Sequence, residues 1–448
     1  MMDIRNSVLI CVFIGFCFLW TGSGDLTWLY NLMDFYPAGI VDVLTEVVGY
    51  IFQIIGLLAF SLYIRKKSKP LYNKMGSIFV IIADFCFVVL AGASANGPLT
   101  LLLGYCMNFF HGAVAGIYLT ALVNYVSRQY RGRVFGFGYA IGSIGSWIIS
   151  LPGDGNFLQS KYVFIVYFIL MALALVIYLV TGDMEVSEMQ ETNENDCAGA
   201  GFIALAGITI FLISMVKSVG FYFPAADLSA GNVSLEFTRV FYAFGLALAG
   251  VIADKNRKYG AVCCVAALIF PFIMLALLDD VGASTWVWIF GYVFFGFFVV
   301  YRVLVFADPA GKGAYYLAGL GLMFGRMGDV AGTALGISMK AYSRVLVIIT
   351  ALLFVATIFV FFSFYQKMYF NQLPEEDAEK LLEAFGNRYE LSPREKEVFR
   401  HIMEGGSNAE IAGKLYISEN TVKFHVKNIL KKTACSNRTE LVTLYKKM

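Results

Sequence analysis

Charged residues are scarce in this sequence of 448 residues. Asp, Glu, Lys and Arg together make up 15% of the chain, whereas about 25% is usual in soluble globular domains. Hydrophobic residues make up 59% and aromatic residues 16%. This composition excludes an ordinary soluble protein and predicts that most of the chain lies in lipid, which is therefore an expected partner.

Histidine and paired cysteine are also rare. The three histidines, His111, His401 and His425, lie far apart in the sequence, and no HExxH, GxSxG or phosphate-binding loop surrounds them. The eight cysteines include no CxxC pair, so neither a disulfide framework nor a zinc site is indicated. We therefore predict no enzyme activity, no catalytic residues, no metal and no cofactor.

Long apolar segments fill the first 369 residues. Each is around 20 residues long, the length that crosses a hydrocarbon core of about 30 Å. The first is interpreted as an uncleaved helix, because no small-residue cleavage site follows it. The twelve approximate spans are 6–30, 40–64, 73–94, 98–126, 134–152, 161–182, 199–223, 233–253, 259–278, 285–306, 313–337 and 344–366. They predict an all-α, twelve-helix membrane bundle.

Two six-span halves are expected, at 1–182 and 199–369, joined by an acidic connector at 183–198. The bias of Lys and Arg toward one set of loops gives the orientation. With the N-terminus inside, the outer segments hold four basic residues, Lys161, Arg239, Lys340 and Arg344. The inner segments hold fifteen, namely Arg5, Arg65, Lys66, Lys67, Lys69, Lys74, Arg128, Arg131, Arg133, Lys255, Arg257, Lys258, Arg302, Lys312 and Lys367. Both termini are therefore expected in the cytoplasm, and the protein in the cytoplasmic (inner) membrane.

Two loop sequences resemble those of the major facilitator superfamily. Gly250-Val-Ile-Ala-Asp254-Lys255-Asn-Arg257-Lys258 is similar to the family's Gly-xxx-Asp-Arg/Lys-x-Gly-Arg-Arg/Lys loop, and Tyr130-Arg131-Gly132-Arg133-Val-Phe-Gly136 to its entry into the fifth helix. The resemblance covers about 370 residues and implies two six-helix halves around a central cavity. At the equivalent loop after span two, Arg65 belongs to a basic cluster but the Gly and Asp are absent, which disfavours active transport.

A few polar residues interrupt the spans. Charged groups at bilayer depth normally face the interior of a bundle. The resemblance implies that spans one, four, seven and ten line the cavity, so Asn108, His111 and Lys217 are candidate contacts for an unknown small molecule, anionic or hydrogen-bonding. Arg326 and Asp329 are further candidates, although a pair three residues apart could simply neutralise itself, and His111 could equally be a satisfied interior histidine. Other charged residues in the spans are Asp84, Glu236 and Arg239.

The composition changes after Phe370 to that of a soluble domain. Residues 374–386 predict a short helix that begins at Pro374 and ends at Gly386, within a coupling linker at 370–390. Three helices are predicted to follow from their capping residues. Ser392-Pro-Arg-Glu395 begins the first, Ser407-Asn-Ala-Glu410 begins the second, and Ser418 caps the third.

The third of these helices, from Glu419 to about Thr433, has two distinct faces. Val422, Val426, Ile429 and Leu430 are predicted to pack inward, while Lys423, Lys427 and Lys431 recur every four residues. Residues 387–448 hold twelve basic and seven acidic residues, a net charge that suits a phosphate-backbone partner. A solvated lysine face alone would be weak evidence for such a partner.

The last sixty residues closely resemble the LuxR-type DNA-binding domain, a small four-helix helix-turn-helix unit at 391–448. The resemblance rests on Leu391-Ser-Pro-Arg-Glu-Lys-Glu-Val398, Gly406-Ser-Asn-Ala-Glu-Ile-Ala412, Thr421-Val-Lys423, His425-Val426 and Arg438-Thr-Glu-Leu441. It implies that the third helix enters the major groove of double-stranded DNA. The implied DNA contacts are Ser407, Asn408, Ser418, Thr421, Lys423, Phe424, Lys427 and Lys431, and the implied face of a homodimer holds Leu441, Val442 and Tyr445.

The combination predicts a membrane-embedded one-component transcription regulator that senses a small molecule or a membrane signal. One alternative is a working transporter with a fused regulatory DNA-binding domain. Another is a helix-turn-helix that docks proteins and not DNA.

Overall fold

The computed structural model of the chain contains two compact units, Met1–Phe364 and Tyr365–Met448. The structure describes residues 2–65, 74–152, 156–181, 200–225, 237–276, 281–311, 314–370, 375–403 and 406–446. The expected connector at 183–198 lies outside these residues, as do Glu236, Pro374 and Gly405. Each unit is described by itself below.

The first unit is helical in all twelve of the predicted segments. Its first half contains α1 (Met2–Met33), α2 (Ala38–Asp42) continued by the π-helix η1 (Val43–Gly49) and by α3 (Tyr50–Arg65), α4 (Lys74–Ala93), α5 (Gly97–Tyr125), α6 (Arg131–Ser150) and α7 (Val163–Thr181). Its second half contains α9 (Ala200–Ala225), α10 (Thr238–Lys255), α11 (Arg257–Ala266) with α12 (Ile269–Ala276), α13 (Val281–Ala307), α14 (Leu320–Ser338) and α15 (Ser343–Tyr365). The all-α prediction is confirmed.

Eight of the helices that the structure describes are long and apolar enough to cross a membrane on their own. The others are α6, α10, α14 and the interrupted pair α11 and α12. Small and polar residues dilute the apolar character of α6, α10 and α14, and all three pack against other helices along their length. Small residues favour such contacts because they let helix backbones approach closely.

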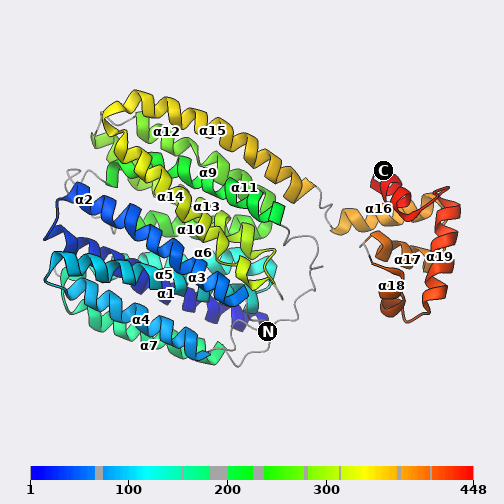
Figure 1. Ribbon diagram of the computed structural model, residues 1–448, viewed down its shortest axis with the longest axis horizontal. Helices are drawn as coiled ribbons and strands as arrows, with labels where there is room; N and C mark the ends of the chain where they lie inside the picture. The colour runs from blue at the N-terminus through cyan, green and yellow to red at the C-terminus, as the bar shows by residue number, and fades with distance from the viewer. Residues whose placement is uncertain are drawn as a thin grey trace. The chain divides into compact units, whose positions relative to one another are not determined.

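The two halves meet along two pairs of helices, α6 with α10 and α3 with α14. Within the first half α1 packs against α5, α6 and α7, and within the second half α14 packs against α9 and α10 against α13 (Figure 1). At its glycines the contact between α6 and α10 is one of backbone against backbone. A Cβ added at Gly250 would lie 2.4 Å from the carbonyl oxygen of Gly132, and one at Gly136 would lie 2.4 Å from that of Leu246.

The two loop sequences that resemble the facilitator family lie against each other at one end of this seam. The Asp254 carboxylate accepts hydrogen bonds from the backbone amides of Gly132 and Arg133, both at 2.8 Å. Arg257 donates to Asp254 at 2.7 Å and to Asp308, at the end of α13, at 2.7 Å. These charge-assisted bonds therefore tie the two halves together at this end.

The beginning of α1 and the end of α15 lie at the same end of the first unit (Figure 1). This arrangement follows from an even number of crossings. The basic residues Arg65, Arg131 and Arg257 belong to this end as well, because α3 ends at Arg65, α6 begins at Arg131 and α11 begins at Arg257, directly after α10.

The second unit contains α16 (Glu375–Arg388), α17 (Pro393–Met403), α18 (Asn408–Leu415), α19 (Glu419–Lys432) and α20 (Arg438–Lys446). Its core is formed by ten buried residues, Phe385, Leu391, Val398, Phe399, Ile402, Ile411, Ala412, Val422, Ile429 and Leu441. The predicted inward faces of α17 and α19 are confirmed, with Val426 and Leu430 only partly buried.

The segment expected to be a coupling linker is part of this unit. Phe385 of α16 is fully buried, and its ring stacks on Phe399 with 4.6 Å between the ring centroids. The prediction that Gly386 ends the helix is wrong, since α16 continues to Arg388 and Glu390 adopts the left-handed conformation. The amide of Leu391 donates to the carbonyl of Gly386 at 2.8 Å, which is the bond pattern of a Schellman ending.

The same ending recurs after α18 and α19. Tyr416 and Ala434 have positive φ angles of 53° and 54°, and the amides of the residues that follow them, Ile417 and Cys435, donate to carbonyls five residues earlier. Sharp left-handed endings thus orient successive helices of the second unit although no glycine occupies these three positions.

Replacing Phe385 by Ala should lower the free energy of unfolding of the second unit by about 3–5 kcal/mol, because a fully buried ring leaves a cavity. Urea unfolding of the fragment 365–448, followed by circular dichroism, measures this change. Phe424→Ala is the matched control: Phe424 is 62% exposed, and the expected change is under about 0.5 kcal/mol. Equal stability of the two variants would show that α16 is not part of the folded unit.

Candidate ligand cavity and nucleic-acid interface

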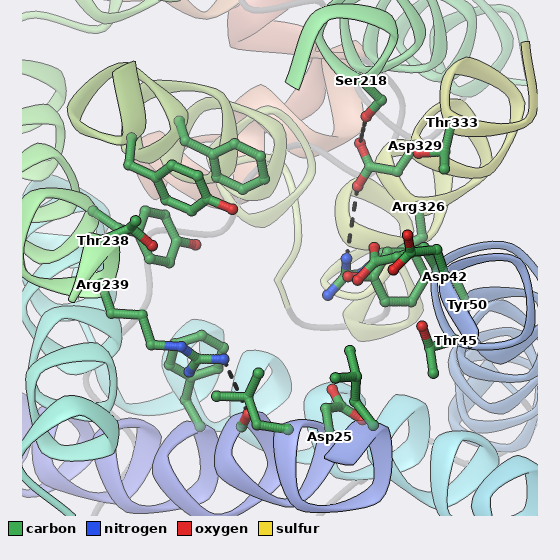
Figure 2. A pocket seen from close by; sticks show the side chains of 18 of the residues that line it. Asp25, Asp42, Thr45, Tyr50, Ser218, Thr238, Arg239, Arg326, Asp329 and Thr333 are labelled. Atoms are coloured by element: carbon green, nitrogen blue, oxygen red, sulfur yellow. Dashed lines mark hydrogen bonds and ion pairs between the residues drawn. The ribbon is translucent and has the colours of Figure 1, made fainter. Parts of the chain in front are cut away.

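A cavity of about 260 Å³ lies between the two halves of the membrane unit. It is lined from both sides, by α1, α2, η1, α3, α5 and α6 of the first half and by α9, α10, α13 and α14 of the second. Figure 2 shows Asp25, Arg239 and Asp329 directed toward this common space from different helices. The cavity is strongly polar for its position inside a membrane bundle.

Asp329 of α14 joins three helices at the edge of the cavity. Its carboxylate accepts from the Lys217 ammonium of α9 at 2.6 Å, from the Ser218 hydroxyl at 3.0 Å and from the Arg302 guanidinium of α13 at 2.9 Å. Both basic side chains are nearly as buried as the carboxylate. Mutual compensation makes these charges tolerable in a region of low dielectric.

Two of the cations also rest on aromatic rings. The Lys217 ammonium lies 4.1 Å from the centroid of the Phe295 ring. The Arg326 guanidinium lies 3.9 Å from that of Tyr50, a residue of the first half. Arg326 is 3.8 Å from Asp329, a longer separation than those of Lys217 and Arg302. The expected pair of Arg326 and Asp329 is therefore present, but Asp329 binds Lys217 and Arg302 more closely.

A buried histidine connects two carboxylates on the opposite side of the cavity. His111 of α5 lies 3.1 Å from Asp25 through Nδ1 and 3.4 Å from Asp84 through Nε2. Asp84 is fully buried and accepts from the Trp20 indole at 2.7 Å. Asp25 is one-third exposed and lines the cavity. His111 thus sits behind Asp25 and supports it.

Four of the five residues expected in a cavity line it: Asn108, Lys217, Arg326 and Asp329. His111 does not, because Asp25 stands between it and the space. Asn108 accepts a hydrogen bond from Gln53 at 2.7 Å and donates to the Gly104 carbonyl.

Several lining residues were not expected. Asp25, Glu46 and Tyr50 lie within the first two predicted spans and were not singled out. Arg302 and Arg239 were counted toward the charge bias between the two sides of the membrane, although both fall inside predicted spans, and neither was predicted to line a cavity. Arg302 is 4% exposed within α13, and Arg239 belongs to α10; both line the cavity. A signal for Arg302 existed, since the apolar run continues after it through Val303 to Ala307.

The helix-turn-helix segment has the predicted caps. The Ser407 side chain accepts from the Glu410 amide while Glu410 accepts from the Ser407 amide, a complete capping box for α18. The equivalent box at Ser392 and Glu395 opens α17. Ser418 caps α19 by accepting from the Thr421 amide at 3.1 Å.

The outward face of α19 carries the predicted basic row. Lys423, Lys427 and Lys431 are all exposed. Lys423 pairs with Glu419 at 3.0 Å across one helical turn, an exposed pair worth only about 0.5 kcal/mol. Phe424 is 62% exposed beside this row, so it is not a packing residue. Ser407 and Ser418 are exposed, and Asn408 and Thr421 are half-buried.

A fourth lysine of α19 has a structural contact. Lys432 donates to the Glu395 carboxylate at 2.7 Å and to the Glu390 carbonyl at 2.8 Å, which joins α19 to α17. Burial by itself would raise the pKa of Glu395, but the bonds from Lys432 and Ser392 outweigh it and hold that pKa below its ordinary value.

The expectation that Leu441 lies on an exposed dimer face is wrong. Leu441 is fully buried in the core of the second unit. Tyr445 packs edge-on against Phe385 and Phe399, with ring centroids 5.5 and 5.6 Å apart. This side of α20 is thus covered within the unit, while Val442 is half-buried.

Solved structures establish the class of fold. The Escherichia coli fucose:proton symporter FucP matches with a TM-score of 0.57 and 14% identity, over 84% of this chain and 100% of that chain. The human organic anion transporter MFSD10 matches with a TM-score of 0.58 and 12% identity, over 81% of this chain and 100% of that chain. FucP is described as a Major Facilitator Superfamily transporter. The membrane unit therefore has the major facilitator fold, as predicted.

The second unit has close relatives in sequence. Residues 389–445 match the family model described as bacterial regulatory proteins, luxR family. The CsgBAC operon transcriptional regulatory protein of Escherichia coli is 53% identical over 53 residues, and the regulatory protein SdiA of Escherichia coli is 54% identical over 51. These matches cover 12% and 11% of this chain and only 24% and 21% of the relatives. The segment is a LuxR-type helix-turn-helix, fused to a facilitator fold.

Replacing Asp329 by Asn should sharply lower the thermal unfolding midpoint of the full-length protein in detergent. The change leaves Lys217 and Arg302 buried without their carboxylate, a loss of about 3–5 kcal/mol for a broken buried pair. Ser218→Ala is the control, since it removes one neutral bond to the same carboxylate, worth about 1 kcal/mol. An Asp329→Asn protein as stable as the control would contradict the role assigned to Asp329.

Proposed function

We propose that the chain is a membrane-embedded one-component transcription regulator. A small molecule in the cavity shifts the two halves of the facilitator fold, and the shift changes how the helix-turn-helix binds double-stranded DNA. One observation carries the proposal: a single chain joins a LuxR-type segment with an exposed lysine row to a facilitator fold with a charged cavity. No catalytic step is part of it.

The DNA-binding part of the proposal rests on α18 and α19. By the family resemblance, α19 enters the major groove, where Lys423 and Lys427 can reach guanine O6 and N7. Ser407, Asn408, Ser418 and Thr421 lie at helix N-termini, where backbone amides and hydroxyls hold phosphates. The list of proposed contacts is completed by Phe424 and Lys431.

We also propose that two chains bind DNA together, since a unit this small rarely binds specifically as a monomer. The dimer surface would use the outward side of α20 with Val442, because Leu441 is enclosed in the core. Both termini would lie in the cytoplasm. Supporting this orientation, the basic end of the membrane unit is the end where α1 begins and α15 finishes.

A working transporter with a fused regulator is the second candidate. Two observations favour it. The Asp254 carboxylate joins the two halves through hydrogen bonds, and the structural match to the fucose:proton symporter covers the whole of that chain. The two candidates can be distinguished by measuring the uptake, into proteoliposomes that contain the protein, of any ligand that changes reporter transcription. Regulation without uptake supports the sensor, and concentrative or facilitated uptake supports the transporter.

The lysine row should determine DNA binding by the fragment 365–448. Binding to duplex DNA is expected to weaken with salt, because lysines displace condensed counterions from phosphates. Lys423→Glu should lower the affinity for sequences selected from a random pool by at least about tenfold, as expected for a lost base contact worth 1–3 kcal/mol. Lys431→Gln should weaken binding to all sequences and reduce the salt slope by about one. Fluorescence anisotropy measures both.

Arg388→Glu is the matched control for these variants. It reverses an exposed charge on α16, outside the helix-turn-helix, and should leave selected-sequence binding within about twofold. A fragment that folds but shows no salt-dependent DNA binding would favour the protein-docking alternative instead. So would a full-length Lys423→Glu protein with unchanged regulation of its target genes.

A further inference from the structure

The charges that line the cavity are divided between its two walls. The first half contributes only carboxylates: Asp25 on α1, Asp42 on α2 and Glu46 on η1. The second half contributes four cations and one carboxylate: Lys217, Arg239, Arg302, Arg326 and Asp329. With all groups ionised, the two walls carry formal charges of −3 and +3. The lining is neutral as a whole, and two of the cations, Arg239 and Arg326, extend to residues of the first half.

Two carboxylates of the first half, Asp25 and Glu46, are not paired with the cations of the second half. Among the residues that the structure describes, Asp25 is paired with His111 of its own half, and neither Asp25 nor Glu46 forms an ion pair with Lys217, Arg302 or Arg326. Arg239 reaches across to the first half, but it donates to the Ser146 hydroxyl and the Gly22 carbonyl, both at 3.1 Å. Asp25 and Glu46 are therefore open to a cationic group of a ligand.

Both walls retain unused hydrogen-bonding capacity. Within the described part of the chain, the Nε atoms of Arg302 and Arg326 are buried and donate to no acceptor. The Arg302 side chain is 4% exposed, so water outside the bundle does not satisfy it. Buried donors without a partner are uncommon and costly, which points to an anionic or acceptor group of a ligand at this wall.

The opposite wall suits a cation. Asp25 is accessible from the cavity, and Trp28, three residues further along α1, also lines it. Tyr50 also lines it, but its ring already carries the Arg326 guanidinium at 3.9 Å, so Trp28 is the aromatic residue considered at this wall. Carboxylates next to aromatic faces are the surroundings in which ammonium groups bind well. An anion alone would satisfy one wall and be repelled by the other, and a neutral sugar would leave both walls uncompensated.

The volume limits the size of the occupant. About 260 Å³ lies just below the range of about 300–1,000 Å³ that is usual for small-molecule pockets. A compact molecule of single-amino-acid size fits this space, whereas an oligosaccharide or a phospholipid does not.

We propose that the cavity binds a small zwitterion of the amino-acid type, with its ammonium group at Asp25 and Glu46 and its acidic group at Arg302 and Arg326. The proposal names the ligand class for the sensing function proposed above and rests on it for its biological meaning. Lys217 and His111 led us to expect an anionic or hydrogen-bonding molecule. Because Asp329 already compensates the charge of Lys217, and because His111 does not line the cavity, these two residues do not by themselves call for an anion.

Matched trios of probes test the proposal on the full-length protein in detergent or nanodiscs. Each trio holds a zwitterion, the amine without its acidic group and the acid without its amine: phenylalanine, phenethylamine and phenylpropionate; leucine, isopentylamine and 4-methylvalerate; 4-aminobutyrate, butylamine and butyrate. Glycine betaine, taurine and a set of hexoses complete the panel. The thermal unfolding midpoint and the change in intrinsic tryptophan fluorescence report binding.

At least one zwitterion should bind, and its amine and acid should bind at least tenfold more weakly. Glu46→Gln and Arg326→Gln should each weaken that zwitterion at least tenfold, while Arg65→Gln, which removes a cation outside the cavity lining, should leave the affinity unchanged. Glu46 makes no ion pair with the Asp329 cluster in the described structure, so its variant keeps the test valid if Arg326→Gln does not fold. Binding of hexoses or of simple acids without any zwitterion overturns the proposal, and so does the absence of binding by every zwitterion.

A transcriptional reporter separates this proposal from the proposed function. If a zwitterion binds but leaves transcription unchanged, the ligand class stands and the sensing function fails. If a hexose or a simple anion alters transcription and no zwitterion does, the sensing function stands and the ligand class is wrong.

Discussion

The compensation of charge around Asp329 is the constraint on which the membrane unit depends. Its carboxylate is shared by cations of α9 and α13 while its own backbone belongs to α14. None of these groups is tolerable alone at this depth, so the three helices are held in one relative register. One wall of the cavity is therefore fixed by electrostatics before any ligand arrives.

Local features were predictable from the sequence. Twelve apolar runs predicted twelve helical segments, and Ser392, Ser407 and Ser418 predicted the starts of α17, α18 and α19. These predictions succeed because hydropathy and capping depend on neighbours within a few residues. The LuxR-type segment is similarly compact, and its motifs are continuous in the sequence.

The pairings were not predictable in the same way. Lys217 and Asp329 are 112 residues apart, and His111 lies between two carboxylates from α1 and α4. A hydropathy window shows that such residues are buried, but not which partners they meet. Leu441 illustrates the same limit: the face that resembles a dimer surface is covered by Phe385 of α16, a helix outside the matched segment.

The seam between α6 and α10 has a consequence for how the halves can move. Backbone meets backbone at Gly132, Gly136 and Gly250, so no rotamer is available there to repack as the halves change position. Any motion of one half relative to the other must therefore displace α6 and α10 as rigid bodies. At one end of the seam the Asp254 carboxylate of the second half is hydrogen-bonded to backbone amides of the first half. One added methyl group at Gly136 or Gly250 would meet a carbonyl oxygen at 2.4 Å and force the two helix backbones apart.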